Sequence, residues 1–319
     1  MSRASIAPIP PGAIDLTGDA VRRRRILQRS AMALLESAGY AEVSPPTFEY
    51  EAVFVRAGGA GVSERLLRFL DLDGRSLALR YDFTASIARI AATTFADSAP
   101  PLRLSYSGKV YRQEPERGAR PREILQVGAE LIGDPGLAPD VEIVRLTIAL
   151  LHGAGVGEFQ VNIGHVGVLA AGLAALDEPQ RAEVRRWIDR KDRASLLRAL
   201  RHADGAAATL TSLPFVMGRR PALEAALDSA PPDARAGLER LLALDAALTD
   251  DERGHVVFDL GEVRGLDYYT GMHFEVFAAG AGRAVGAGGR YDDLMERFGR
   301  ELPAVGVSID LDALAELEP

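Results

Sequence analysis

The stretch Leu125-Gln126-Val127-Gly128-Ala129-Glu130-Leu131-Ile132 decides the fold class of this chain. Apolar side chains occupy alternate positions, which is the period of a β-strand with one face turned to a hydrophobic core. The surrounding residues 102–133 predict an antiparallel pair of strands. Further strands are expected at 41–44, 76–80, 159–163, 255–260, 266–277 and 304–309, and helices at 19–38, 84–95, 140–151 and 311–317, with Thr84 as a cap. This order predicts an α+β fold, with a mostly antiparallel sheet flanked by helices.

The segment between residues 166 and 250 differs in composition from the rest of the chain. Alanine, leucine and arginine dominate it, and prolines at 179, 214, 221, 231 and 232 interrupt it. Short helices are therefore expected there. We divide the chain into a first part of the sheet-containing core (1–165), a helical insertion (166–250) and a second part of the core (251–319).

Composition excludes several classes of function. The chain has 319 residues, and 37 Lys and Arg against 45 Asp and Glu give a net charge of −8, which argues against general nucleic-acid binding. It contains no cysteine, so thiol catalysis, Cys-ligated zinc and disulfides are excluded. Residues 1–11 lack the apolar segment of a secretory signal, and no apolar run approaches the ~20 residues of a membrane span. A cytoplasmic protein without membrane contact is expected.

Common cofactor and catalytic motifs find little support. The glycines at 153–157 follow a predicted helix and are typical of a helix stop, whereas those at 286–289 indicate close backbone approach or a bulge. The five histidines show no ligand spacing on a helix, and no Gly-x-Ser-x-Gly elbow occurs. We therefore expect no metal and no cofactor.

Polar side chains inside the predicted strands form the candidate site. Gln126 and Glu130 are four residues apart and project from the same side of one strand, with Gly128 leaving room between them. A pocket of such groups suits a zwitterionic small molecule, because glutamate accepts an ammonium group and arginine binds a carboxylate. The alternative, a solvated polar face of the sheet, is left open by the pattern. The other candidates on predicted strands or just after them are Arg112, Arg264, Tyr269 and Tyr291.

Two long motifs resemble a known family. The stretches Arg264-Gly265-Leu266-Asp267-Tyr268-Tyr269 and Ala287-Gly288-Gly289-Arg290-Tyr291-Asp292 resemble the two histidine-specific signatures of the histidyl-tRNA synthetase catalytic domain. Shorter stretches resemble other elements of that class II synthetase, namely 111–114 with 126–130 (motif 2), 79–84 (the Leu-Arg-Pro-Glu-Gly-Thr segment) and Pro45-Pro46 (the dimer-forming motif 1). The resemblance covers residues 11–317. It implies a class II aminoacyl-tRNA synthetase-like core.

The departures from the synthetase pattern indicate a different function. Where motif 3 of the synthetase places an arginine that holds ATP phosphate, this chain has Ala313, which offers neither charge nor a fork of donors. Asp82 replaces a glutamate of the family. The sequence also ends where the anticodon-binding domain of the synthetase would begin. Together these departures resemble the histidyl-tRNA-synthetase-like regulatory subunits of ATP phosphoribosyltransferase.

That resemblance implies partners and a ligand. It implies a non-catalytic subunit that pairs with a short-form catalytic subunit in the first step of histidine biosynthesis, in a dimer within a hetero-octamer, with L-histidine as inhibitor and no tRNA. In the pocket carried over from the synthetase, Asp82 and Glu130 would hold the amino group with Thr84 and Gln126 in support. Other residues would surround the carboxylate and the imidazole: Arg112 and Arg264, and Tyr268, Tyr269 and Tyr291.

Two other functions stay open at this stage. A synthetase paralogue that adenylates an amino acid and transfers it to an acceptor other than tRNA would use Arg112 and Arg264, although Ala313 opposes it. A scaffold with a vestigial pocket would bind no histidine at all.

Overall fold

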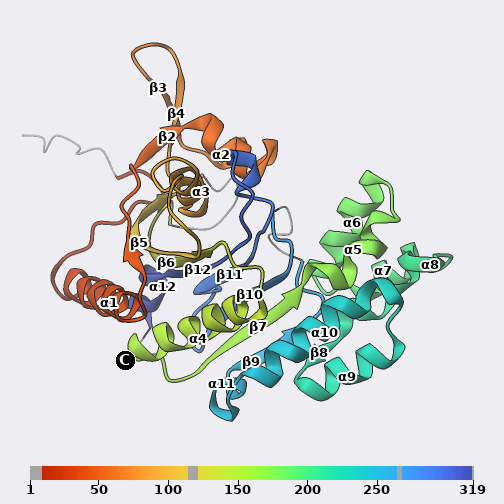
Figure 1. Ribbon diagram of the computed structural model, residues 1–319. Coiled ribbons are helices and arrows are strands. Elements are labelled where there is room, and N and C mark those ends of the chain that lie inside the picture. The colour runs from red at the N-terminus through yellow and green to blue at the C-terminus, as the bar shows by residue number, and fades with distance from the viewer. Residues whose placement is uncertain (1–8, 114–120, 264–267, 318–319) are drawn as a thin grey trace, which may run out of the picture.

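A nine-stranded mixed sheet forms the centre of the computed structural model, which describes residues 9–113, 121–263 and 268–317 (Figure 1). In spatial order its strands are β1 (Ala41–Glu42), β5 (Leu102–Tyr111), β6 (Glu123–Ile132), β12 (Ala304–Asp310), β11 (Gly286–Arg290), β10 (Met272–Ala278), β7 (Phe159–His165), β9 (Val256–Asp259) and β8 (Met217–Gly218). Among the strands of the described residues, β1 with β5 and β7 with β9 pair in parallel, and the other pairs are antiparallel. The mostly antiparallel sheet predicted from the sequence is confirmed.

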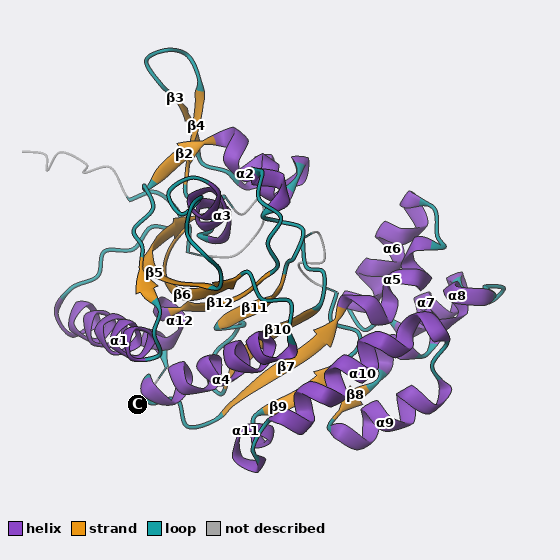
Figure 2. Ribbon diagram, in the orientation of Figure 1, coloured by secondary structure: helices purple, strands orange, loops and turns teal. Residues whose placement is uncertain are grey.

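The two faces of the sheet are covered by different helices (Figure 2). Leu125 and Leu131 of β6 point into a core shared with α1 (Gly18–Ser37), α4 (Leu137–Gly153) and α12 (Leu311–Glu316). Ile124 and Ile132 point to the opposite face, into a second core with α2 (Glu51–Gly58) and α3 (Thr84–Ala92). Because side chains alternate along a strand, Gln126, Gly128 and Glu130 share this second face with α3.

A small antiparallel sheet stands beside the second core. Its strands follow the order β2 (Phe48–Tyr50), β4 (Ser76–Leu79) and β3 (Arg68–Leu70), and the β3–β4 hairpin projects from the body of the molecule (Figure 1). The 3₁₀ turns η1 (Ala60–Arg65) and η4 (Glu296–Phe298) accompany α2 and α3.

The segment 166–250 is helical, and it gathers beyond the β7–β9–β8 edge of the main sheet (Figure 1). Its elements are α5 (Val166–Ala174), α6 (Glu178–Asp189), α7 (Arg193–Ala199), α8 (Gly205–Ala208), η2 (Thr209–Thr211), η3 (Leu213–Phe215), α9 (Arg220–Ser229) and α10 (Pro232–Ala247), and α11 (Asp250–Gly254) ends it. Strand β8 of this segment pairs with β9, so the helical segment contributes a strand to the sheet. The division into three segments stays a prediction.

The structure corrects several expected boundaries. The strand expected at 41–44 ends at Glu42, and the helix expected from residue 140 already begins at Leu137. The strand expected from residue 266 begins at Met272, so Tyr269 precedes it. Within the described ranges, none of the helices is both long and apolar enough to cross a bilayer.

Candidate functional site

A pocket lies between β6 and the start of α3. Its volume is about 220 Å³, and it contains six of the nine expected site residues in its lining. The lining comprises Tyr81, Asp82, Phe83, Thr84, Tyr106, Arg112, Gln126, Glu262, Tyr268, Tyr269, His273, Phe274, Glu275, Ala287 and Ser308. Glu130 and Tyr291 lie directly behind this lining, in contact with it, whereas Arg264 lies outside the described residues.

Glu130 is the centre of this site. Its side chain is 1% exposed, so the alternative of a solvated polar face is wrong for this position. Thr84 Oγ1 donates to Oε1 over 3.0 Å, the Tyr106 hydroxyl donates to Oε1 over 3.3 Å, and the Tyr291 hydroxyl donates to Oε2. Burial raises the pKa of Glu130 to about 7, although these three hydrogen bonds oppose the rise. Uncharged donors thus leave the carboxylate suited to a cationic ligand group.

Asp82 supplies a carboxyl group to the lining of this pocket. Its Oδ1 accepts a hydrogen bond from the Ala85 amide over 3.1 Å, which makes Asp82 the capping side chain of α3. The expectation that Thr84 caps this helix is wrong, because Thr84 is the first helical residue and its hydroxyl is bonded to Glu130. Burial raises the pKa of Asp82, and the positive charge of Arg112 opposes that rise. Asp82, Glu262 and Glu275 line the cavity and Glu130 lies directly behind it, and this excess of carboxyl groups favours an ammonium ligand.

Among the described residues, Arg112 is the arginine or lysine that lines the cavity. It follows the last residue of β5, one position beyond the strand, and its Nε donates to the Tyr81 carbonyl over 3.3 Å. Its guanidinium carbon lies 5.2 Å from the centroid of the Tyr81 ring. The carboxylates and this guanidinium therefore give the cavity both signs of charge.

Two glycines create the space that Glu130 and its partners occupy. A Cβ on Gly128 would lie 2.3 Å from the Tyr106 hydroxyl, and a Cβ on Gly306 of β12 would lie 1.6 Å from Glu130 Oε2. The sequence predicted room beside Gly128, and Tyr106 of β5 occupies it. Any side chain at position 306 would displace the carboxylate.

Aromatic rings form another wall of the site. The Tyr268 ring lies 4.5 Å from that of Tyr269 and 5.9 Å from that of Tyr291, measured between centroids. Tyr269 also stacks on His273, at 5.7 Å and 16°. Burial raises the pKa of Tyr269 to about 12, so its hydroxyl stays protonated at neutral pH. This wall can pack against a planar ring.

Sequence reasoning missed several residues of the pocket. Tyr106 stacks on Phe83 at 4.1 Å and 10°, and it has the same parity along β5 as the buried Leu102 and Leu104, a signal that could have identified it. Glu262, His273 and Glu275 also line the cavity, and no spacing in the sequence pointed to them. His273 Nε2 lies 2.9 Å from the Glu262 carbonyl oxygen.

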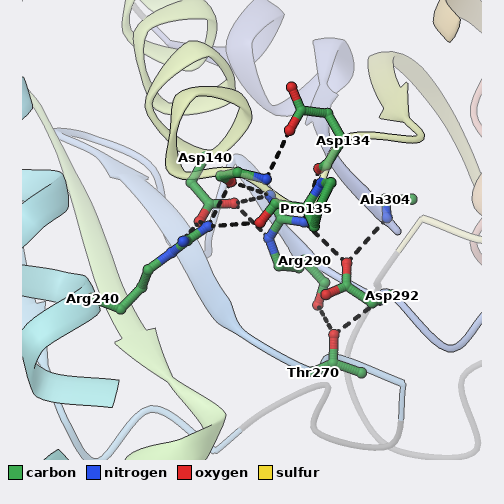
Figure 3. A network of polar contacts seen from close by, with 9 residues as sticks. Asp134, Pro135, Asp140, Arg240, Thr270, Arg290, Asp292 and Ala304 are labelled. Atoms are coloured by element: carbon green, nitrogen blue, oxygen red, sulfur yellow. Dashed lines mark hydrogen bonds and ion pairs between the residues drawn. The ribbon is translucent and has the colours of Figure 1, made fainter. Parts of the chain in front are cut away.

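The second histidine-specific signature serves the fold as well as the pocket (Figure 3). Arg290, 4% exposed, donates to Asp140 Oδ1 over 2.7 Å through Nε and to Asp292 over 3.0 Å. Arg240 of α10 binds the other oxygen of Asp140 over 2.7 Å. This network connects β11 to α4 and α10. The adjacent Tyr291 points toward Glu130 instead and donates its hydroxyl to that carboxylate.

Position 313 holds no phosphate-binding group. Ala313 is 4% exposed, packs into the core shared with α1 and α4, and donates its amide to Asp310 Oδ1 over 2.8 Å. Within the part of the chain that the structure describes, no cluster of three or more His, Asp or Glu side chains could hold a metal ion.

Comparison with known proteins places this geometry in a family. The family model described as histidyl-tRNA synthetase matches residues 12–314. An ATP phosphoribosyltransferase regulatory subunit from Moorella thermoacetica is 38% identical over 316 residues, covering 96% of this chain and 80% of that protein. A second, from Syntrophotalea carbinolica, is 36% identical over 315 residues, with 96% and 73% covered. The chain belongs to the histidyl-tRNA-synthetase-like family of ATP phosphoribosyltransferase regulatory subunits.

Solved structures agree with this family membership. A protein from Bacillus halodurans, described as an ATP phosphoribosyltransferase regulatory subunit/histidyl-tRNA synthetase, superposes with a TM-score of 0.88 at 31% identity and covers 99% of this chain and 84% of its own. The histidyl-tRNA synthetase from Nostoc sp. has a TM-score of 0.78 at 22% identity, covering 96% and 74%, and thus shares the fold. The expected class II synthetase-like core is confirmed.

Proposed function

We propose that this chain is the non-catalytic regulatory subunit that a short-form ATP phosphoribosyltransferase catalytic subunit requires for the first step of histidine biosynthesis. In this assembly it confers feedback inhibition by L-histidine. The observation that carries the proposal is the buried Glu130, held by three hydroxyl groups directly behind the lining of the cavity that Asp82 lines. Such a site suits the ammonium group of a free amino acid.

The binding mode of histidine follows the chemistry of the lining. Asp82 and Glu130 hold the ammonium group, with Thr84 and Gln126 in support, and this neutralises carboxyl groups that burial otherwise penalises. The carboxylate lies toward Arg112, which lines the cavity, whereas Arg264, the other residue expected there, lies outside the described residues. The imidazole packs against the aromatic wall of Tyr268, Tyr269 and Tyr291.

The chain itself carries out no adenylation. Ala313 lies in the hydrophobic core, so no guanidinium from α12 reaches a phosphate. The net charge of −8 opposes a tRNA partner, because binding of a polyanion needs concentrated positive charge. The pocket is therefore an effector site.

The proposed assembly is a dimer of this chain within a hetero-octamer with the catalytic subunit, located in the cytoplasm. Inhibition requires that histidine bind the inhibited state of this assembly more tightly than the active state. Equal affinity for both states would shift no population, however tight the binding.

The decisive experiment measures phosphoribosyl-ATP formation from ATP and phosphoribosyl pyrophosphate. The cognate short-form catalytic subunit is assayed with and without this chain, and each mixture is titrated with histidine. The proposal expects that this chain raises activity and makes it sensitive to histidine. A catalytic subunit that is active but unaffected by this chain would refute it, and histidine-dependent ATP–pyrophosphate exchange by the isolated chain would favour the adenylating paralogue instead.

A further inference from the structure

The loop that follows β9 carries part of the pocket. Glu262 lines the cavity, and its carbonyl oxygen lies 2.9 Å from Nε2 of His273, which also lines it. Both residues are almost fully buried. The conformation of residues 260–263 therefore sets the shape of this side of the pocket.

An ion pair joins the helical segment 166–250 to Asp259, the last residue of β9, directly before this loop. Lys191, in the turn between α6 and α7, places Nζ 2.8 and 2.9 Å from the two carboxylate oxygens of Asp259. Asp259 is 4% exposed, and its Oδ1 also accepts the Gly261 amide over 2.9 Å. One carboxylate thus links a helical turn to the first residues of the loop.

Backbone contacts reinforce this connection. The Leu260 amide donates to the Val216 carbonyl over 3.0 Å. A Cβ on Gly261 would lie 2.1 Å from the Pro214 carbonyl oxygen, so the loop packs directly against residues 214–216. A displacement of these residues would have to move the loop as well.

Lys191 adopts a backbone conformation that favours glycine. Its φ is 54°, and among the described residues it is the one non-glycine residue with a positive φ. Glycine would adopt this backbone conformation at a lower free-energy cost, so an interaction of the lysine side chain must offset the strain. Its ion pair with Asp259 supplies that compensation.

We propose that Lys191 is a positioning residue for the histidine pocket, through which the helical segment 166–250 sets the affinity for histidine. This inference rests on the proposed function, because it assumes that the pocket binds histidine. Coupling between two regions is reciprocal, so histidine binding also stabilises the contact between loop and helical segment. A partner that moved the turn at Lys191 would change histidine affinity without touching the pocket.

The test compares Lys191→Met with a matched control, Arg220→Met. Arg220 pairs with Asp245 inside the same helical segment, and the exposed fractions are equal in the two pairs, 45% for the cation and 5% for the carboxylate. Methionine keeps the backbone strain and all but the last atom of the lysine side-chain length, and it removes the charged Nζ. Calorimetric titration with L-histidine should show a Kd raised about fivefold or more in Lys191→Met, a Kd within about twofold of wild type in Arg220→Met, and recovery in Lys191→Arg.

The outcomes separate the two proposals. If wild type binds no histidine, the proposed pocket fails and this inference fails with it. If wild type binds and Lys191→Met binds equally well, only the positioning role is overturned.

A second measurement uses wild type alone, so it tests the inference even if Lys191→Met does not fold. In wild type, histidine should slow amide hydrogen exchange at residues 188–196, Phe215 and Val216, and unchanged exchange there would overturn the inference.

Discussion

Replacing Glu130 by glutamine tests the electrostatics of the pocket, because the substitution removes the charge and keeps the size. Burial raises the pKa of this carboxyl from 4.5 to about 7. An acid with a higher pKa in the folded state binds more protons when folded, so the free energy of unfolding falls as pH rises from about 4.5 to about 7. With ~1.4 kcal/mol per pKa unit, Glu130 alone should lower stability by about 2–3 kcal/mol between pH 5 and pH 8.

Urea unfolding of wild type and Glu130→Gln at pH 5 and pH 8 measures this contribution, since other titrating groups cancel in the difference between the two proteins. At pH 5 the variant should be the less stable protein, because its amide NH₂ brings two donors to a site where the protonated carboxyl of wild type brings one and where three hydroxyls already lie. At pH 8 it should recover about 2–3 kcal/mol relative to wild type. If the two proteins differ in free energy of unfolding by the same amount at both pH values, burial does not raise the pKa of Glu130, and the reasoning is refuted.

Three further predictions follow from the same geometry. Gly306→Ala should abolish histidine binding in calorimetry, because its Cβ would lie 1.6 Å from Glu130 Oε2, whereas Gly157→Ala, with open space around its Cβ, should bind as wild type does. Arg290→Met leaves the fully buried Asp140 with one of its two guanidinium partners and should lower the free energy of urea unfolding by about 3 kcal/mol; a loss below 1 kcal/mol would contradict the network. Histidine binding at pH 7 should release roughly half a proton from Glu130, seen as different binding enthalpies in buffers of different ionisation enthalpy, and equal enthalpies would count against it.

The sequence predicted the sheet and its two faces because alternation along a strand is a local property. Gln126 and Glu130 share a face with Gly128 for that reason, and their burial follows from α3, which covers that face. Tyr106 could be assigned to the same face from its parity along β5. Its contact with Glu130 could not be predicted, because that contact depends on the register between β5 and β6.

The parts that escaped prediction depend on contacts between distant segments. Threonine is a residue type favoured at the start of a helix, yet the Thr84 hydroxyl donates to Glu130, 46 residues away in the sequence. Asp82 accepts the hydrogen bond from the first turn of the helix instead. Glu262 reaches the pocket through a loop that begins after Asp259, the partner of Lys191, and that packs against residues 214–216. Local propensity carries no information about either partner.

The same reasoning explains why motifs in this chain indicate the fold more firmly than the activity. In the stretch Arg290-Tyr291-Asp292, Arg290 holds β11 to Asp140 of α4, Asp292 binds Arg290 and the Ala304 amide of β12, and Tyr291 donates to Glu130. This signature therefore has structural roles that do not depend on adenylation. Gly306 has such a role too, since it makes room for Glu130. A phosphate-binding arginine at position 313 would have no comparable role, and alanine fills that position in a packed core. A chain can therefore keep the signatures and the amino-acid pocket without the group that anchors ATP, which is the combination that an effector-binding subunit needs.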